Sequence, residues 1–123
     1  MERDTQQRRA IRAAFERTAR PIAPPEVLDE AKPSVPKLGI ATVYRNLKAL
    51  VEEGWLKAVE LPGQPPRYER SGIGHHHHFH CRICGKVFDI DGCVGKLQGM
   101  VPKGFVLEDH DVVLYGRCKE CAA

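Results

Sequence analysis

Two Cys-x-x-Cys pairs, Cys81 with Cys84 and Cys118 with Cys121, constrain the fold of this 123-residue chain more than any other feature. Thiolates separated by two residues can bind one ion from a single turn, and two such pairs supply the four ligands of a tetrahedral zinc site. The segment between the pairs must then form structure of its own that returns the chain to the metal. We therefore predict one structural Zn²⁺ bound by these four cysteines.

A run of histidines leads directly into the first cysteine pair. It covers His75–His78 and continues through Phe79 and His80 to Cys81. Alternate side chains of a β-strand point to opposite faces, so the even-numbered histidines would share one face and the odd-numbered ones the other. A purification tag also contains consecutive histidines, but a tag lies at a chain end and this run is internal. Histidine and cysteine side chains are common metal ligands, so this run of histidines next to a cysteine pair predicts metal binding.

The cysteines have two other interpretations. A disulfide framework is typical of secreted proteins, but residues 1–12 are charged and do not resemble a signal peptide, so we expect a reducing cytoplasm. A thioredoxin-like redox motif needs one Cys-x-x-Cys pair at a strand-to-helix turn, not two. The fifth cysteine, Cys93, is predicted to be a small buried residue.

The charge of the chain is unevenly distributed. The formal net charge of +3 falls in residues 1–70, which hold 13 Lys and Arg against 10 Asp and Glu, whereas the positive and negative residues of 71–123 balance. A basic excess in the half without the paired cysteines is compatible with nucleic-acid binding there. No apolar run approaches the length that spans a bilayer, so we expect no membrane association.

Hydrophobic periodicity predicts three helices in the first half of the chain. The first begins near Thr5, a candidate N-cap, and ends at Pro21, because the residue before a proline avoids the α region. The second covers residues 23–32, with prolines in its first turn. The third covers Gly39–Gly54, and its buried stripe consists of Val43, Leu47, Leu50 and Val51.

A β-hairpin is predicted after the third helix, with strands at Trp55–Leu61 and Arg67–Arg70. Three helices and a hairpin make a winged helix, in which the third helix enters the DNA major groove. Residues of that helix outside the buried stripe are therefore candidates for DNA contact, as is Arg8 near the start of the first helix. The candidates on the third helix are Thr42, Tyr44, Arg45 and Lys48.

The second half is predicted to form a small sheet. Strands are expected at His75–Cys81 and Lys86–Ile90, a short helix within residues 94–101, and a longer apolar strand within residues 105–115. A sheet with a crossover helix is suited to pairing across a two-fold axis. The fold class is therefore α+β, with a winged-helix domain at 1–72 and a dimerisation and metal-binding domain at 73–123.

These motifs resemble the Fur family of metal-responsive repressors. The resemblance rests on Ala41–Leu47, on His75–Cys81, on Cys84 to Val87 and on Leu114–Cys118, and it covers nearly the whole chain in order and spacing. It implies a homodimer that binds a palindromic double-stranded DNA operator when loaded with a divalent metal. It also assigns the four-cysteine set to a structural zinc.

The resemblance implies two further metal sites. A regulatory site, for Fe²⁺, Zn²⁺ or Mn²⁺, takes an acid of the wing, two histidines of an HxH strand and a carboxylate after the first cysteine pair. These positions are Glu69, His76, His78 and Asp89. Some relatives have a further metal site on the other face of this strand. One acidic ligand of that site is replaced in this chain, near Lys96. The positions of that site here are His75, His77 and His110.

Two departures from the family pattern leave the regulatory metal open. Many iron and peroxide sensors of the family have a histidine in the hinge where this chain has Pro21, so peroxide sensing is disfavoured. Zinc sensors often use a cysteine near the end of the wing, where this chain has Ser71. Glu60, expected opposite Glu69 in the hairpin, is an alternative ligand.

The sequence thus predicts a cytoplasmic, metal-dependent transcriptional repressor rather than an enzyme. A zinc-dependent hydrolase or deaminase is the first alternative, but a deaminase needs an HxE motif and a PCxxC motif, and the residue before Cys81 is His80. A metal-storage module is the second alternative. It would not need a winged helix, so specific binding to an operator separates it from a repressor.

Overall fold

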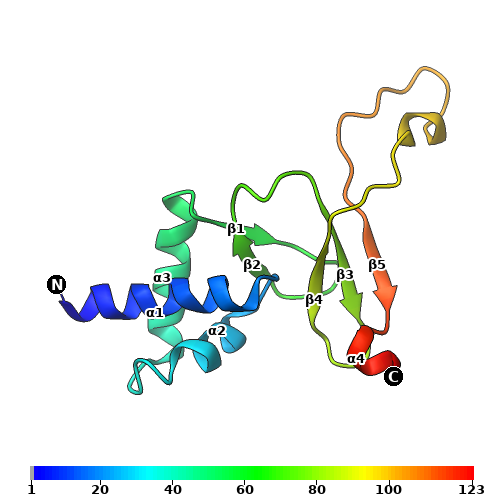
Figure 1. Cartoon of the computed structure of the whole chain (residues 1–123). Helices are drawn as coiled ribbons and strands as arrows, with labels where there is room; N and C mark the ends of the chain where they lie inside the picture. The colour runs from blue at the N-terminus through cyan, green and yellow to red at the C-terminus, as the bar shows by residue number, and fades with distance from the viewer. Residues whose placement is uncertain (1) are drawn as a thin grey trace. The chain divides into compact units, whose positions relative to one another are not determined.

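A computed structural model describes the backbone of residues 2–123, which divides into two compact units (Figure 1). The first unit extends to Ile73, and the second runs from Gly74 to Ala123. None of the helices in the described part of the chain is long and apolar enough to cross a membrane.

The first unit consists of three helices and a hairpin. The helices are α1 (Glu2–Thr18), α2 (Pro24–Ala31) and α3 (Ile40–Glu52). Strands β1 (Leu56–Val59) and β2 (Arg67–Arg70) pair antiparallel. The three predicted helices and the hairpin are confirmed, and the helices begin and end near the prolines and glycines of the sequence. For example, Pro24 lies in the first turn of α2. Backbone N–H groups in the first turn make no hydrogen bond within the helix, so a proline there costs none.

The helices of the first unit meet around one hydrophobic core. Ile11 of α1, Val27 of α2 and Leu50 of α3 have no exposed surface, and Phe15 and Leu47 are at most 2% exposed. Burying each of these side chains contributes about 1.5–3 kcal/mol. The predicted stripe of α3 is therefore confirmed at its central positions, and the opposite face of this helix is left to solvent.

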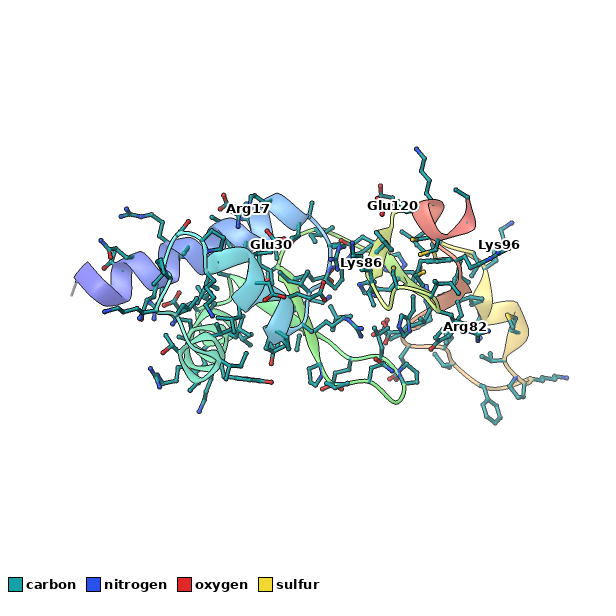
Figure 2. The ribbon with its side chains drawn as sticks, turned by 90° about the horizontal axis from the view of Figure 1, so that it is seen from below. Arg17, Glu30, Arg82, Lys86, Lys96 and Glu120 are labelled. Atoms are coloured by element: carbon teal, nitrogen blue, oxygen red, sulfur yellow. The ribbon has the colours of Figure 1, made fainter. Side chains whose placement is uncertain are left out.

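Polar contacts on the surface add little to this packing. The Arg17 side chain of α1 and the Glu30 side chain of α2 lie next to one another (Figure 2). Arg17 Nη2 donates to the Glu30 carbonyl oxygen at 2.6 Å and lies 3.4 Å from the Glu30 carboxylate. Both side chains are about half exposed, and such pairs contribute about 0–1 kcal/mol. The apolar core, not this pair, fixes α1 against α2.

The second unit is a three-stranded sheet with the order β4-β3-β5. Its strands are β3 (His77–Cys81), β4 (Val87–Ile90) and β5 (Val113–Gly116). β3 pairs antiparallel with β4 and parallel with β5. The segment between β4 and β5 extends well beyond the sheet and carries the short 3₁₀ helix η1 (Leu97–Met100) (Figure 1). The C-terminal turn is α4 (Lys119–Ala122).

Three sequence predictions about these elements are wrong, and a fourth is confirmed only in part. Thr5 lies inside α1 and is not its N-cap. The short helix expected within residues 94–101 is confirmed in part: it is the 3₁₀ helix η1, because glycines within and beside the segment raise the cost of an α-helix. The strand expected within residues 105–115 is limited to the four residues of β5. Glu69 pairs with Lys57, so Glu60 does not lie opposite it.

The second unit has a very small apolar interior. Among its described residues, only Cys81, Val87 and His77 are buried. Large apolar side chains of this unit are instead exposed, namely Ile83, Val94, Met100, Phe105, Val106, Leu114 and Tyr115. So little burial cannot offset the conformational entropy of ordering the chain. Metal binding and association must supply much of the stability of this unit.

Candidate metal centres and DNA-binding helix

The four paired cysteines come together in the second unit. Their sulfur atoms all lie within 4.8 Å of one another, and Cys84 Sγ is 3.8 Å from Cys118 Sγ. Four sulfurs each about 2.3 Å from a tetrahedral zinc lie about 3.8 Å apart, so this geometry fits a Zn²⁺ and is too open for a disulfide. The turn after β3 and the N-terminus of α4 position the two pairs.

Backbone amides prepare Cys81 to bind a cation. The N–H groups of Cys84 and Cys118 donate to Cys81 Sγ at 3.5 and 3.4 Å. The Cys84 amide is the main cause that lowers the pKa of the Cys81 thiol to about 6. The Cys118 side chain, in contrast, raises the pKa of Cys121 to about 12 by hydrogen bonding. Cys81 is therefore mostly a thiolate at neutral pH, whereas metal binding must displace the proton of Cys121.

A second group of candidate metal ligands includes His78 of β3 and His76, which directly precedes this strand. His76 Nε2 and His78 Nε2 are each 3.3 Å from the same oxygen, Asp89 Oδ1 of β4. The β3–β4 register places Asp89 directly opposite His78. Ligand atoms about 2.1 Å from a tetrahedral ion lie about 3.4 Å apart, so these three atoms fit one metal. The predicted alternation of β3 thus brings His76, His78 and Asp89 together.

The tautomer of His76 suits metal binding. Its Nδ1 lies 2.8 Å from the Gly74 carbonyl oxygen, which can only accept, so Nδ1 carries the proton and donates it. The lone pair is then on Nε2, the atom that faces Asp89. A hydrogen bond from the distal ring nitrogen is the arrangement that orients ligand histidines in metalloproteins.

Glu69, the fourth residue of the predicted regulatory set, belongs to the first unit. It lies in β2, opposite Lys57 of β1, and its side chain is buried. Buried carboxylates are rare unless they are paired or bind a metal. Pro21, at the predicted hinge position, is buried and offers no ligand atom.

A third group lies on the odd-numbered face of β3. Here His75, His77 and His110 surround Cys93, and the ligand atoms all lie within 4.8 Å of one another. The prediction that Cys93 is buried is wrong, because this residue is exposed in the segment between β4 and β5. The missed signal is its setting between Gly92 and Gly95, which is typical of a loop rather than of a core. Lys96, near the position where the resemblance implies an acid, is exposed at the start of η1 (Figure 2).

His77 lies at the centre of this third group and is 2% exposed. Burial is the main cause that lowers its pKa below the usual value of 6.5, and the neighbouring His75 and His110 lower it further. The imidazole therefore stays neutral at physiological pH, as a metal ligand must.

The predicted DNA-contact residues lie on the exposed side of α3. Tyr44 is 53% exposed, Arg45 and Lys48 are exposed, and Thr42 is half-buried. Arg45 Nη2 donates to Thr42 Oγ1 at 3.0 Å, which orients the guanidinium along the helix. A polar hollow of about 170 Å³ is lined by Gln7, Arg8, Thr42, Arg45 and Asn46.

Arg8 is engaged within the first unit. Its Nη1 is 3.1 Å from Glu53 Oε1, and its Nε donates to Asn46 Oδ1 at 3.4 Å. The side chain thus links α1 to the middle of α3 and to its C-cap residue, Glu53. A phosphate contact would compete with the ion pair to Glu53, so Arg8 is the weakest of the predicted DNA contacts.

Relatives of known identity cover most of this chain. Residues 2–115 match the model of the ferric uptake regulator family. The transcriptional regulator FurA of Mycobacterium tuberculosis is 33% identical over 92 residues, covering 72% of this chain and 63% of FurA. The chain thus spans less than two thirds of the length of FurA. The ferric uptake regulation protein of Campylobacter jejuni is 31% identical over 122 residues, covering 95% of this chain and 78% of that protein.

Solved structures give the same result and confirm the α+β prediction. The ferric uptake regulator of Helicobacter pylori, described as having three functional metal binding sites, matches with a TM-score of 0.73 and 28% identity over 95% of this chain and 80% of that one. A zinc-bound manganese uptake regulator matches with a TM-score of 0.80 and 28% identity over 92% and 88% of the two chains. The chain belongs to the ferric uptake regulator family.

Proposed function

We propose that this protein is a metal-dependent transcriptional repressor that binds operator DNA as a homodimer in the cytoplasm. The observation that carries the proposal is the convergence of His76 and His78 on one oxygen of Asp89. These three ligands do not complete the coordination shell of a metal ion. The unit that precedes them consists of helices and a hairpin, and one face of its third helix is exposed. Neither a storage protein nor an enzyme needs that helix.

In this proposal, Glu69 supplies the fourth ligand. Glu69 is in the wing, whereas the three other ligands are in the second unit. A divalent ion bound by all four would hold the winged helix of each subunit in one orientation toward the dimer core. If that orientation matches the half-site spacing, metal lowers the cost of placing both reading helices on DNA. By linkage, operator DNA must then tighten metal binding by the same factor.

Homodimer formation is supported by the open edge of the sheet in the second unit. β5 is an edge strand, and its Leu114 and Tyr115 are 49% and 41% exposed. Exposed apolar side chains on a strand with one unpaired edge favour association with another strand. A two-fold partner would cover them and would present two winged helices to the two halves of a palindrome.

The donor set leaves Fe²⁺, Mn²⁺ and Zn²⁺ as candidates for the regulatory metal. Two imidazoles with two carboxylates are intermediate in hardness and suit each of these ions. The test is a gel shift with DNA from the upstream region of the protein's own gene, titrated separately with the three ions. A metal-storage protein would bind the ions without any gain in operator affinity.

Replacing Arg45 with alanine should weaken operator binding without changing the fold. Arg45 is exposed on α3 and carries a guanidinium that can bind a guanine edge through two hydrogen bonds. We expect a loss of about 1–3 kcal/mol in the free energy of operator binding, measured by fluorescence anisotropy.

The matched control for this variant is Lys32→Ala, which removes an exposed positive charge at the end of α2. Lys32→Ala should change operator affinity much less than Arg45→Ala does. If the two variants lose equal affinity, Arg45 contributes only general charge. If Arg45→Ala binds as the parent does, α3 does not read the operator.

A further inference from the structure

Two buried side chains of opposite charge lie close together on β2. The chain has 19 Lys and Arg residues and 16 Asp and Glu residues, but among residues 5–123, whose burial is described, the buried Lys, Arg, Asp and Glu side chains are only Arg67 and Glu69. Arg67 is 8% exposed and Glu69 is 2% exposed. Residues two positions apart on a strand point to the same face and lie about 6.6 Å apart. The two buried charges therefore share one face of one strand.

The backbone of β2 holds these two side chains in place. Tyr68, which lies between them, exchanges two backbone hydrogen bonds of 2.9 Å with Ile22 and packs against the core of the first unit. Along its other edge β2 pairs with β1, where Lys57 lies opposite Glu69. The strand is thus fixed along both edges, so the two charges cannot separate by a shift of the backbone.

Burial decides which positive charge acts most strongly on Glu69. Arginine and glutamate are almost never buried unless their charges are compensated, because an isolated ion loses its hydration. Lys57 is directly opposite Glu69 but is exposed, so water and salt screen its charge. Arg67 is screened much less, because it is buried on the same face as the carboxylate. Arg67 therefore supplies the buried positive charge that offsets Glu69.

We propose that Arg67 sets the metal concentration at which the regulatory site fills. The inference rests on the proposed role of Glu69 as a ligand of that site. Before metal binds, the Arg67 guanidinium stabilises the Glu69 carboxylate. A divalent ion on Glu69 takes over that compensation and is repelled by the guanidinium. Arg67 thus favours the metal-free form and opposes the loaded form, and both effects lower the affinity for metal.

The size of this effect follows from Coulomb's law. At about 7 Å and an effective dielectric constant of about 20, one unit charge changes the binding constant of another by about 50-fold. A divalent ion experiences twice that interaction energy, and water near the site screens part of it. We therefore expect Arg67 to lower the affinity for a divalent ion by about 10–100-fold.

Manganese titration tests this inference without DNA. The four-cysteine site carries zinc, and Mn²⁺ suits imidazole and carboxylate ligands rather than thiolates. Free Mn²⁺ is counted from its electron paramagnetic resonance signal at about pH 8, well above the usual pKa of a carboxyl group. Arg67→Met should bind Mn²⁺ about 10–100-fold more tightly than the parent. Arg67→Lys, which keeps the charge, should bind it as the parent does, and Glu69→Gln should lose most of this binding.

Lys57→Met is the matched control. It removes a positive charge directly opposite Glu69, but an exposed one, so it should change the affinity for Mn²⁺ much less than Arg67→Met does. Thermal unfolding without the regulatory metal gives a second measurement. Arg67→Met should lower the Tm, because it leaves the Glu69 carboxylate buried without its counter-charge. Adding Glu69→Gln to Arg67→Met should recover part of that loss.

Four results would overturn the inference: Mn²⁺ binding by Arg67→Met that is no tighter than in the parent, an equal gain in Lys57→Met, parent-like binding by Glu69→Gln, or no recovery of Tm in the double variant. Operator binding is measured separately. If Arg67→Met binds Mn²⁺ more tightly but the metal does not raise operator affinity in the parent, the repressor proposal fails and the role of Arg67 stands. If metal raises operator affinity in the parent while Arg67→Met binds Mn²⁺ no more tightly, only the role of Arg67 fails.

Discussion

Cys81→Ser should lose the structural zinc and unfold the second unit while the first unit stays folded. Cys81 has no exposed surface and accepts hydrogen bonds from two backbone amides, so it is the most constrained of the four thiolates. A structural zinc contributes about 10–16 kcal/mol in small zinc domains, which is as much as the whole stability of a typical domain. The few buried residues of the second unit cannot replace that contribution, whereas the first unit keeps its own core.

Zinc content per chain, hydrogen exchange and sedimentation together check this prediction. The parent should retain about one zinc through mild chelation because four thiolates complete the shell. Amides of β3, β4 and β5 should exchange rapidly in Cys81→Ser, and amides of α1 and α3 should remain protected. Cys93→Ser is the matched control, since it removes an exposed thiol outside the four-cysteine set. A dimeric, folded and zinc-free Cys81→Ser protein would contradict the prediction.

Elements with strong local signals could be predicted from the sequence. The first unit has amphipathic helices bounded by prolines and glycines, and the observed helices follow these signals closely. The alternation of β3 was also sufficient to sort its histidines into two ligand sets, because side chains of a strand alternate whatever the rest of the fold does. Spacing alone predicted that the four paired cysteines would meet, and their sulfurs are within 4.8 Å of one another.

The structure of the segment between β4 and β5 could not be predicted from local sequence signals. Its glycines weaken any periodic signal, and its apolar residues remain exposed, so their pattern does not report a buried face. β5 is parallel to β3 and distant from it in sequence, so the pairing of the two strands sets its length. The position of Cys93 depends on this long-range pairing, which brings His110 to the start of β3. The flanking glycines indicate a loop at Cys93, but nothing in the local sequence indicates that this loop lies beside His110.

The double substitution His76→Ala with His78→Ala should abolish metal-dependent operator binding while the four-cysteine zinc and the dimer persist. Both imidazoles face Asp89 Oδ1, and neither belongs to the four-cysteine set. In the parent, metal should raise operator affinity by about 5–150-fold, the usual range of coupling between two sites. The double variant should show no measurable gain with Fe²⁺, Mn²⁺ or Zn²⁺.

The reverse face of the same strand provides the matched control. His75→Ala with His110→Ala also removes two imidazoles, but from the set around Cys93. This control should retain the metal-dependent gain, so the comparison separates loss of the regulatory ligands from a general weakening of the second unit. The gain in the parent should also fall as pH is lowered through the histidine range, because a ligand imidazole must be neutral. If the gain survives in the His76 and His78 variant and disappears in the control, the regulatory metal is bound on the odd-numbered face of β3. Glu69 would then have no part in the switch, and the wing would have to be held by some other contact.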